Sequence, residues 1–202
     1  MSIFYIIRHA HKELGEFYNP RLRHQDEPIS RMGREDSHKL WSYLCNKHIT
    51  AIYNSGYLRT RQTIEYFAER SGLIPVMDER LNEIDNGCIE GMTDDAIRKT
   101  YPEVSRGFRE RSADFRFPEG ETGEEARRRI ASFLEEKQRL HSDENIVLVS
   151  HEGLIRLTAC HILGLPVYRR WDFQYDFCGI TEISFQPDYG TWKLLRFNQK
   201  LS

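Results

Sequence analysis

Short runs of apolar, β-branched and aromatic residues recur along the chain and end abruptly in polar residues. Residues 3–8 (IFYIIR) and 145–150 (NIVLVS) are apolar at consecutive positions, the pattern of parallel strands buried on both faces. A shorter run at 51–54 and a weaker one at 74–77 predict two more strands. The last run, 178–197, predicts a closing hairpin of 178–185 and 191–197.

Between these runs, apolar positions three and four residues apart predict helices with recognisable ends. Ser30 and Thr93 are expected N-caps, and Gly72 has the place of a C′ residue. Thr122 to Glu125 has the form of a capping box. The expected helices cover 31–47, 57–71, 93–101, a stretch from Thr122 to about Leu140, and 153–163.

Strands that alternate with helices predict an α/β fold, a three-layer α/β/α sandwich with a mainly parallel central sheet and an antiparallel edge. The 202 residues fit a single domain, 1–202. Within it, residues 11–28 form a long irregular loop with turn signals. Pro102 is expected to end a helix, and we expect a mobile lid or insertion at about 92–121.

Composition narrows the function classes. Lys and Arg (29) nearly balance Asp and Glu (31), so no overall charge predicts a nucleic-acid or membrane partner. The four cysteines lie far apart without a C-x-x-C pair, which favours reduced thiols over disulfides or a zinc site. With no apolar run long enough for a membrane span or typical of a signal peptide, we expect a cytoplasmic protein.

The carboxyl ends of parallel strands share one edge of a sheet, which is where ligands bind. That rule brings Arg8 and His9, the turn 55–59 and His151 together. Imidazoles among guanidinium groups disfavour a metal ion and favour a phosphate, and a neutral imidazole can attack phosphorus. Glu83, in the loop after the third strand, is the expected proton donor; three other acids compete for that role, Asp85, Glu90 and Glu13.

Four ordered blocks of the chain resemble the histidine phosphatase superfamily, the phosphoglycerate mutase-like proteins. Residues 8–10 (RHA) are similar to its R-H-G block and 55–63 (SGYLRTRQT) to S-x-x-x-R-A-x-Q-T. Residues 81–91 resemble the acid-donor loop, and 150–156 (SHEGLIR) resemble S-H-G-G-x-x-R. Weaker similarities lie at 26–33 and 119–122.

The resemblance implies site roles residue by residue. His9 would become phosphorylated, Glu83 would donate the proton, and the phosphate would be bound by Arg8, Arg59 and His151. It implies no metal ion and no organic cofactor. The expected activity is that of a histidine acid phosphatase-like phosphoric monoester hydrolase, acting through a phosphohistidine on a small phosphorylated metabolite.

The chain departs from the family pattern in three places. Ala10 replaces the glycine after the nucleophile, and residues 11–13 (HKE) replace the usual E-T-x-W-N start. Asn19 and Arg21 are candidates for the phosphate contacts of that segment. Glu152 replaces a glycine, and it would either repel a carboxylate-bearing substrate or point to solvent.

Several alternatives stay open from the sequence. A phosphoglycerate mutase would return the phosphoryl group to the substrate, although that activity in the family goes with longer chains. A non-catalytic phospho-ligand binding protein would need neither His9 nor Glu83. The arginine-rich segment 106–116 is either a solvated face or part of a lid that meets an anionic substrate. A homodimer is compatible with the sequence.

Overall fold

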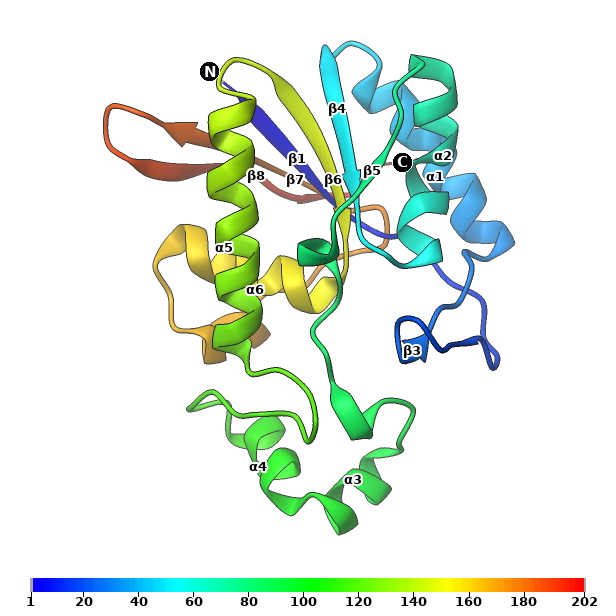
Figure 1. The fold of residues 1–202 in the computed structure, drawn as a ribbon, viewed down its shortest axis with the longest axis vertical. Coiled ribbons are helices and arrows are strands. Elements are labelled where there is room, and N and C mark those ends of the chain that lie inside the picture. The colour runs from blue at the N-terminus through cyan, green and yellow to red at the C-terminus, as the bar shows by residue number, and fades with distance from the viewer. Residues whose placement is uncertain (1, 202) are drawn as a thin grey trace.

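The computed structural model describes residues 2–201 as a six-stranded sheet between two layers of helices (Figure 1). The strand order is β5-β4-β6-β1-β7-β8. The first four strands are parallel, and β7 and β8 add an antiparallel hairpin at one edge. The predicted three-layer, mainly parallel α/β fold is therefore confirmed. The strands are β1 (Ile3–Arg8), β4 (Ile49–Asn54), β5 (Val76–Met77), β6 (Asn145–Ser150), β7 (Ile180–Gln186) and β8 (Thr191–Gln199).

Alternate residues of the central strands face two separate cores. On one face, Tyr5 and Ile7 of β1 pack with α1 (Arg31–Leu44) and α2 (Leu58–Ser71). On the other face, Phe4 and Ile6 pack with α5 (Gly123–Leu140) and α6 (Glu152–Leu163). This two-sided burial explains why β1 and β6 are apolar at consecutive positions.

The predicted helix ends are confirmed where a capping residue marks them. Ser30 Oγ accepts a hydrogen bond from the Gly33 amide at the start of α1. Thr122 and Glu125 form the predicted capping box of α5, and Gly72 ends α2 with φ of 72°. Helix α1 stops at Leu44, one turn earlier than expected.

Pro102 ends one helix, as expected, and also begins another helix that the sequence did not predict. Pro102 closes α3 (Asp94–Thr100) and begins α4 (Pro102–Glu110), where proline fits the first turn because that turn needs no amide donor. Val104 of α4 and Phe117 after it are buried in the core on the α5 side. The movement of this segment as a lid stays a prediction.

Strand β5 is a marginal edge strand. It pairs with β4 over two residues, and Ile74, Val76 and Met77 are exposed. Its weak sequence signal reflects this position, because an edge strand buries little of its surface.

The 11–28 loop folds into a small hairpin of β2 (Tyr18–Asn19) and β3 (His24–Gln25). Its two ends are joined by backbone hydrogen bonds from Glu13 to Pro28 (2.9 Å) and from Ser30 to His11 (2.8 Å). Gly33 is required beneath this stem, since a Cβ there would lie 2.2 Å from the His11 carbonyl oxygen. The loop is thus an ordered cover beside the carboxyl end of β1.

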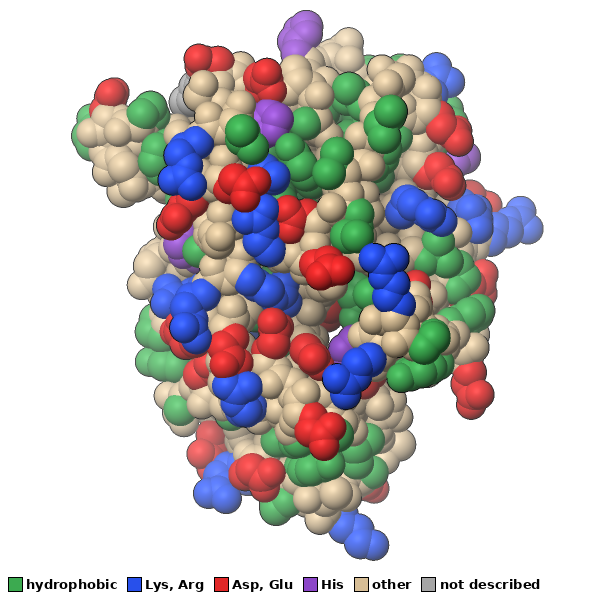
Figure 2. All heavy atoms as spheres, in the orientation of Figure 1, with side chains coloured by type: hydrophobic (Ala, Val, Ile, Leu, Met, Phe, Trp, Pro, Cys, Tyr) green, Lys and Arg blue, Asp and Glu red, His purple; other side chains and the backbone are tan. Residues whose placement is uncertain are grey.

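Acidic and basic side chains are interspersed over the face shown in Figure 2, in agreement with the nearly balanced charge of the chain. Within residues 2–201, none of the helices combines the length and the apolar character that crossing a membrane requires.

Candidate active site

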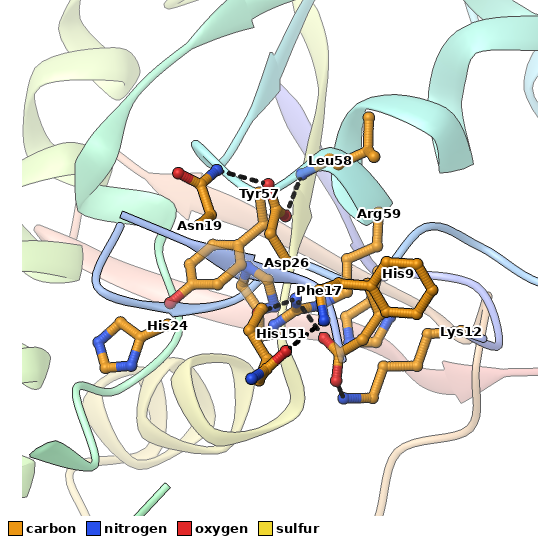
Figure 3. Close-up of polar contacts among 12 residues, drawn as sticks. His9, Lys12, Phe17, Asn19, His24, Asp26, Tyr57, Leu58, Arg59 and His151 are labelled. Carbon is orange, nitrogen blue, oxygen red and sulfur yellow. Dashed lines mark hydrogen bonds and ion pairs between the residues drawn. The ribbon is translucent and has the colours of Figure 1, made fainter. Parts of the chain in front are cut away.

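The carboxyl ends of β1, β4 and β6 bring together the predicted residues of three sequence blocks, 8–10, 55–63 and 150–156. The His9 amide donates to the Ser150 carbonyl (2.9 Å), which fixes the end of β1 beside the end of β6. The ring centroids of His9 and His151 lie 5.2 Å apart. Figure 3 shows both imidazoles converging with Arg59 on one place.

His9 is held in one tautomer by its own neighbour. Its Nδ1 lies 2.8 Å from the Ala10 carbonyl oxygen, and because a carbonyl can only accept, Nδ1 carries the proton. Nε2 is then the nitrogen with the free lone pair. Ala10 fits without strain: it is fully buried, its amide donates to Thr63 Oγ1 (2.8 Å), and it is not among the described residues with positive φ.

His151 is completely buried and occupies the N-cap position of α6, where its side chain makes no capping hydrogen bond. Its Nε2 lies 2.8 Å from Ser55 Oγ, and its ring meets the edge of Tyr57 at 4.7 Å. Its Nδ1 has no partner among the described residues, although it is buried. An unpaired buried nitrogen of this kind is costly unless a ligand satisfies it.

Burial holds the pKa of both imidazoles well below the usual value of 6.5, and the positive charge of Arg59 lowers them further. Both rings are therefore neutral at neutral pH, as a nitrogen nucleophile requires. His24 is the opposite case, because its hydrogen bond to Glu90 raises the pKa of its imidazole.

We expect a side-chain NMR titration of the ligand-free protein to separate these histidines. His24 should gain its proton above pH 6.5, and His9 and His151 only well below it, because the first faces carboxylates and the others are buried beside cations. Signals are assigned with His24→Asn and His9→Asn variants. A His9 that titrates above pH 6.5 would contradict the neutral nucleophile.

Two guanidinium groups flank the imidazoles, each with a buried nitrogen that has no partner. Arg59, at the start of α2, is 6% exposed; its Nη1 lies 3.3 Å from both the Gln25 carbonyl oxygen and Glu27 Oε2. Arg8 lies over the Phe177 ring at 4.0 Å and pairs with Glu152 at 3.0 Å. The Nε atoms of both arginines are unpaired in the described chain. Together with His151 Nδ1 they are the unpaired polar atoms that an anion would satisfy.

Glu83 lies at the amino-terminal end of α6, next to His151. Its Oε2 accepts from the Gly153 amide (3.2 Å) and its Oε1 from the Leu154 amide (3.0 Å). A Cβ at Gly153 would lie 2.6 Å from Glu83 Oε1, so the glycine makes room for the carboxylate. Arg129 donates to the Glu83 carbonyl (2.9 Å) and fixes the loop.

The three competing acids lie elsewhere. Asp85 and Glu90 both contact His24, at the tip of the 11–28 loop. Glu13 is exposed and uses its backbone to pair with Pro28. Among these carboxylates, Glu83 is the one in contact with the α6 end that carries His151.

A pocket of about 310 Å³ adjoins Glu83. Its walls include Glu152, Arg156 and Arg170, with Trp171 and Phe108 as apolar surface. Glu152 neither points freely to solvent nor stands alone, because it pairs with both Arg8 (3.0 Å) and Arg156 (2.6 Å).

Two arginines of the 106–116 segment lie in different surroundings. Arg116 bonds to Glu125 and the Gly120 carbonyl, whereas Arg111 lies 5.2 Å from the Trp171 ring at a neighbouring pocket.

Asn19 and Arg21 do not reach the imidazoles. They line a neighbouring groove of about 760 Å³, together with Ser55, Tyr57 and the exposed Arg61. Asn19 instead donates to Asp26 (2.9 Å), and Asp26 accepts from the Leu58 amide (2.7 Å). These bonds attach the 11–28 loop to the start of α2.

Four residues near the imidazoles were given no individual role from the sequence: Lys12, Glu27, Ser55 and Tyr57. Ser55 and Tyr57 lie within the 55–63 block, so their position there was the available signal. Lys12 and Glu27 pair at 2.5 Å across the 11–28 loop, which has no periodic pattern that predicts such a contact.

Comparison with known proteins gives one consistent result. The family model described as "Histidine phosphatase superfamily (branch 1)" matches residues 4–200. "Phosphoserine phosphatase 1" of Hydrogenobacter thermophilus is 32% identical over 174 residues, 85% of this chain and 81% of that protein. "Probable phosphoglycerate mutase GpmB" of Escherichia coli is 28% identical over 185 residues, 90% and 84% of the two chains. The solved structure of Bacillus stearothermophilus YhfR has a TM-score of 0.81 with 24% identity, covering 96% of each chain, and so shares the fold.

Proposed function

Because the chain belongs to the histidine phosphatase superfamily and is a phosphoric monoester hydrolase of that type, we propose that it works through a phosphohistidine on His9. The observation that carries the proposal is the neutral His9 ring, with its Nε2 lone pair free, beside unpaired nitrogens of Arg8, Arg59 and His151.

In the first step, Nε2 of His9 attacks phosphorus while the bond from phosphorus to the ester oxygen breaks. Glu83 starts this step protonated and gives its proton to the departing oxygen, so the product is a neutral alcohol. The Nδ1–H of His9 keeps its hydrogen bond to the Ala10 carbonyl, which stabilises the positive charge that the ring acquires. The arginines and His151 bind the non-bridging oxygens.

In the second step, water attacks phosphorus and the phosphorus–nitrogen bond breaks. Glu83, now a carboxylate, takes the proton of the water, and orthophosphate and neutral His9 are released. The protein returns to its starting protonation state.

The proposed substrate is a small phosphorylated metabolite. The pocket of about 310 Å³ next to Glu83 has room for a compact leaving group rather than a polymer. Phosphoserine is the first compound to assay, because a relative with 32% identity is named as a phosphatase for it.

Hydrolysis and trapping together test the proposal. The wild-type protein should release orthophosphate from p-nitrophenyl phosphate and phosphoserine, and brief reaction with a radiolabelled ester should leave acid-labile, base-stable label on the protein. Inactivity toward every phosphoester offered would favour a phospho-ligand binding protein. Transfer of the label to an added phosphoglycerate rather than to water would favour a mutase, the activity for which the GpmB relative is named.

A cytoplasmic location also belongs to the proposal. All four cysteines are free thiols in the structure, including the buried Cys160 and Cys178, as expected in a reducing compartment.

A further inference from the structure

One carboxylate of the 11–28 loop connects two cations beside the imidazoles. Glu27 is 8% exposed; its Oε1 lies 2.5 Å from Lys12 Nζ and its Oε2 lies 3.3 Å from Arg59 Nη1. Figure 3 shows Lys12 and Arg59 in the same region as His9 and His151. Arg59 is a proposed phosphate ligand, so Glu27 occupies a group that a phosphate would need.

Lys12 is positioned by the backbone and keeps a flexible side chain. Its backbone forms an isolated antiparallel bridge with Ile29, and the neighbouring bonds from Glu13 to Pro28 and from Ser30 to His11 fix the stem on either side. Its side chain is 37% exposed, in contrast to 7% for Arg59. Lys12 can therefore redirect its ammonium group without moving the chain.

The positive charge of Lys12 affects the imidazoles of His9 and His151. After burial and Arg59, it is among the causes that hold the pKa values of His9 and His151 down. A dianionic phosphoryl group on His9 would lie in the same field, where an ammonium with three donors suits a non-bridging oxygen. The fixed negative charge of Glu27 would repel that phosphoryl group.

We propose that Lys12 is an additional phosphate-binding residue of this site, and that Glu27 is a positioning residue that holds Lys12 and Arg59 until a substrate phosphate replaces its carboxylate. The inference rests on the proposed function. It assigns a role to Lys12, one of the residues that replace the usual family sequence after the nucleophile.

Two variants should shift phosphate binding in opposite directions. Lys12→Met removes an ammonium donor and should weaken the binding of orthophosphate by about tenfold or more, since a bond to a charged group is lost. Glu27→Gln removes the competing charge and should tighten binding by roughly threefold to tenfold. Titration calorimetry with orthophosphate on the full chain measures both values. Lys12→Arg should restore much of the affinity that Lys12→Met loses.

Surface pairs on α1 supply matched controls. Lys39→Met and Glu35→Gln make the same changes at exposed residues paired within the helix, and neither should alter phosphate affinity. A general loss of stability would weaken binding in both test variants, so opposite shifts exclude that explanation. Unchanged affinity in Lys12→Met, or weaker binding in Glu27→Gln, would overturn the inference.

The binding measurement also separates this inference from the hydrolase proposal, because it needs no turnover. Wild-type hydrolysis with unchanged affinity in Lys12→Met would refute the role of Lys12 and leave the phosphohistidine mechanism intact. Wild-type protein that binds orthophosphate but hydrolyses no ester would refute the mechanism, while the Lys12 variants still decide the inference. No binding of orthophosphate by the wild type would overturn it.

Discussion

Replacement of His9 by alanine is expected to reduce hydrolysis of p-nitrophenyl phosphate by about 10⁴-fold or more, because it removes the proposed nucleophile. Acid-labile labelling should disappear at the same time. The variant should keep its fold, since β1 is fixed by its pairing with β6 and β7 rather than by the imidazole. Steady-state kinetics, trapping with a radiolabelled ester and thermal unfolding measure the three effects.

His38 provides the control for this change. It is an exposed histidine that stacks on Tyr66 at 4.1 Å on the outer helices, and His38→Ala should leave the rate unchanged. If His9→Ala hydrolysed the ester as fast as the wild type, the phosphohistidine mechanism would be wrong.

The second large effect concerns Glu83 and depends on the leaving group. Glu83→Gln cannot transfer a proton, so it should slow release of an alcohol from phosphoserine by about 10² to 10⁴-fold. The p-nitrophenolate ion leaves without a proton, and labelling of the protein by p-nitrophenyl phosphate should therefore be slowed much less. Glutamine can still accept one of the amide hydrogen bonds from Gly153 and Leu154, which preserves the start of α6.

Glu13→Gln is the matched control, because Glu13 is exposed and was a competing proton donor. Rapid-quench measurements with both esters separate formation of the phosphoenzyme from its hydrolysis. An equal loss for the two leaving groups would show that Glu83 positions the site rather than donating a proton. A larger loss in Glu13→Gln would transfer the role to that residue.

The parts of the fold that could be predicted are those with a strong burial pattern. Strands β1 and β6 are apolar at every central position because helices cover both faces, and their polar ends mark the edge where His9 and His151 meet. Caps made a second reliable signal, since Ser30 and Thr122 bond to their own helices. These elements could be predicted because burial patterns and helix caps can be recognised within a short stretch of sequence.

The features that the sequence did not predict arise where one residue serves two elements or where no periodic pattern exists. Pro102 both ends α3 and begins α4, and the sequence alone suggested only the first. The pairing of Lys12 with Glu27 depends on the tertiary return of the 11–28 loop, and no local preference encodes it. The ion pairs of Glu152 were not predicted either, because its partner Arg8 lies far away in the sequence. Repulsion of a carboxylate-bearing substrate by Glu152 stays a prediction.

The burial of the two imidazoles, 5% exposed for His9 and fully hidden for His151, has a consequence for the order of events in the proposed mechanism. The leaving alcohol forms on the side of Glu83 and its pocket, whereas orthophosphate forms innermost, among the arginines. The alcohol then departs first and orthophosphate last. A protein built in this way would slow down as inorganic phosphate accumulates, so its rate would follow the phosphate level around it without any separate regulatory site.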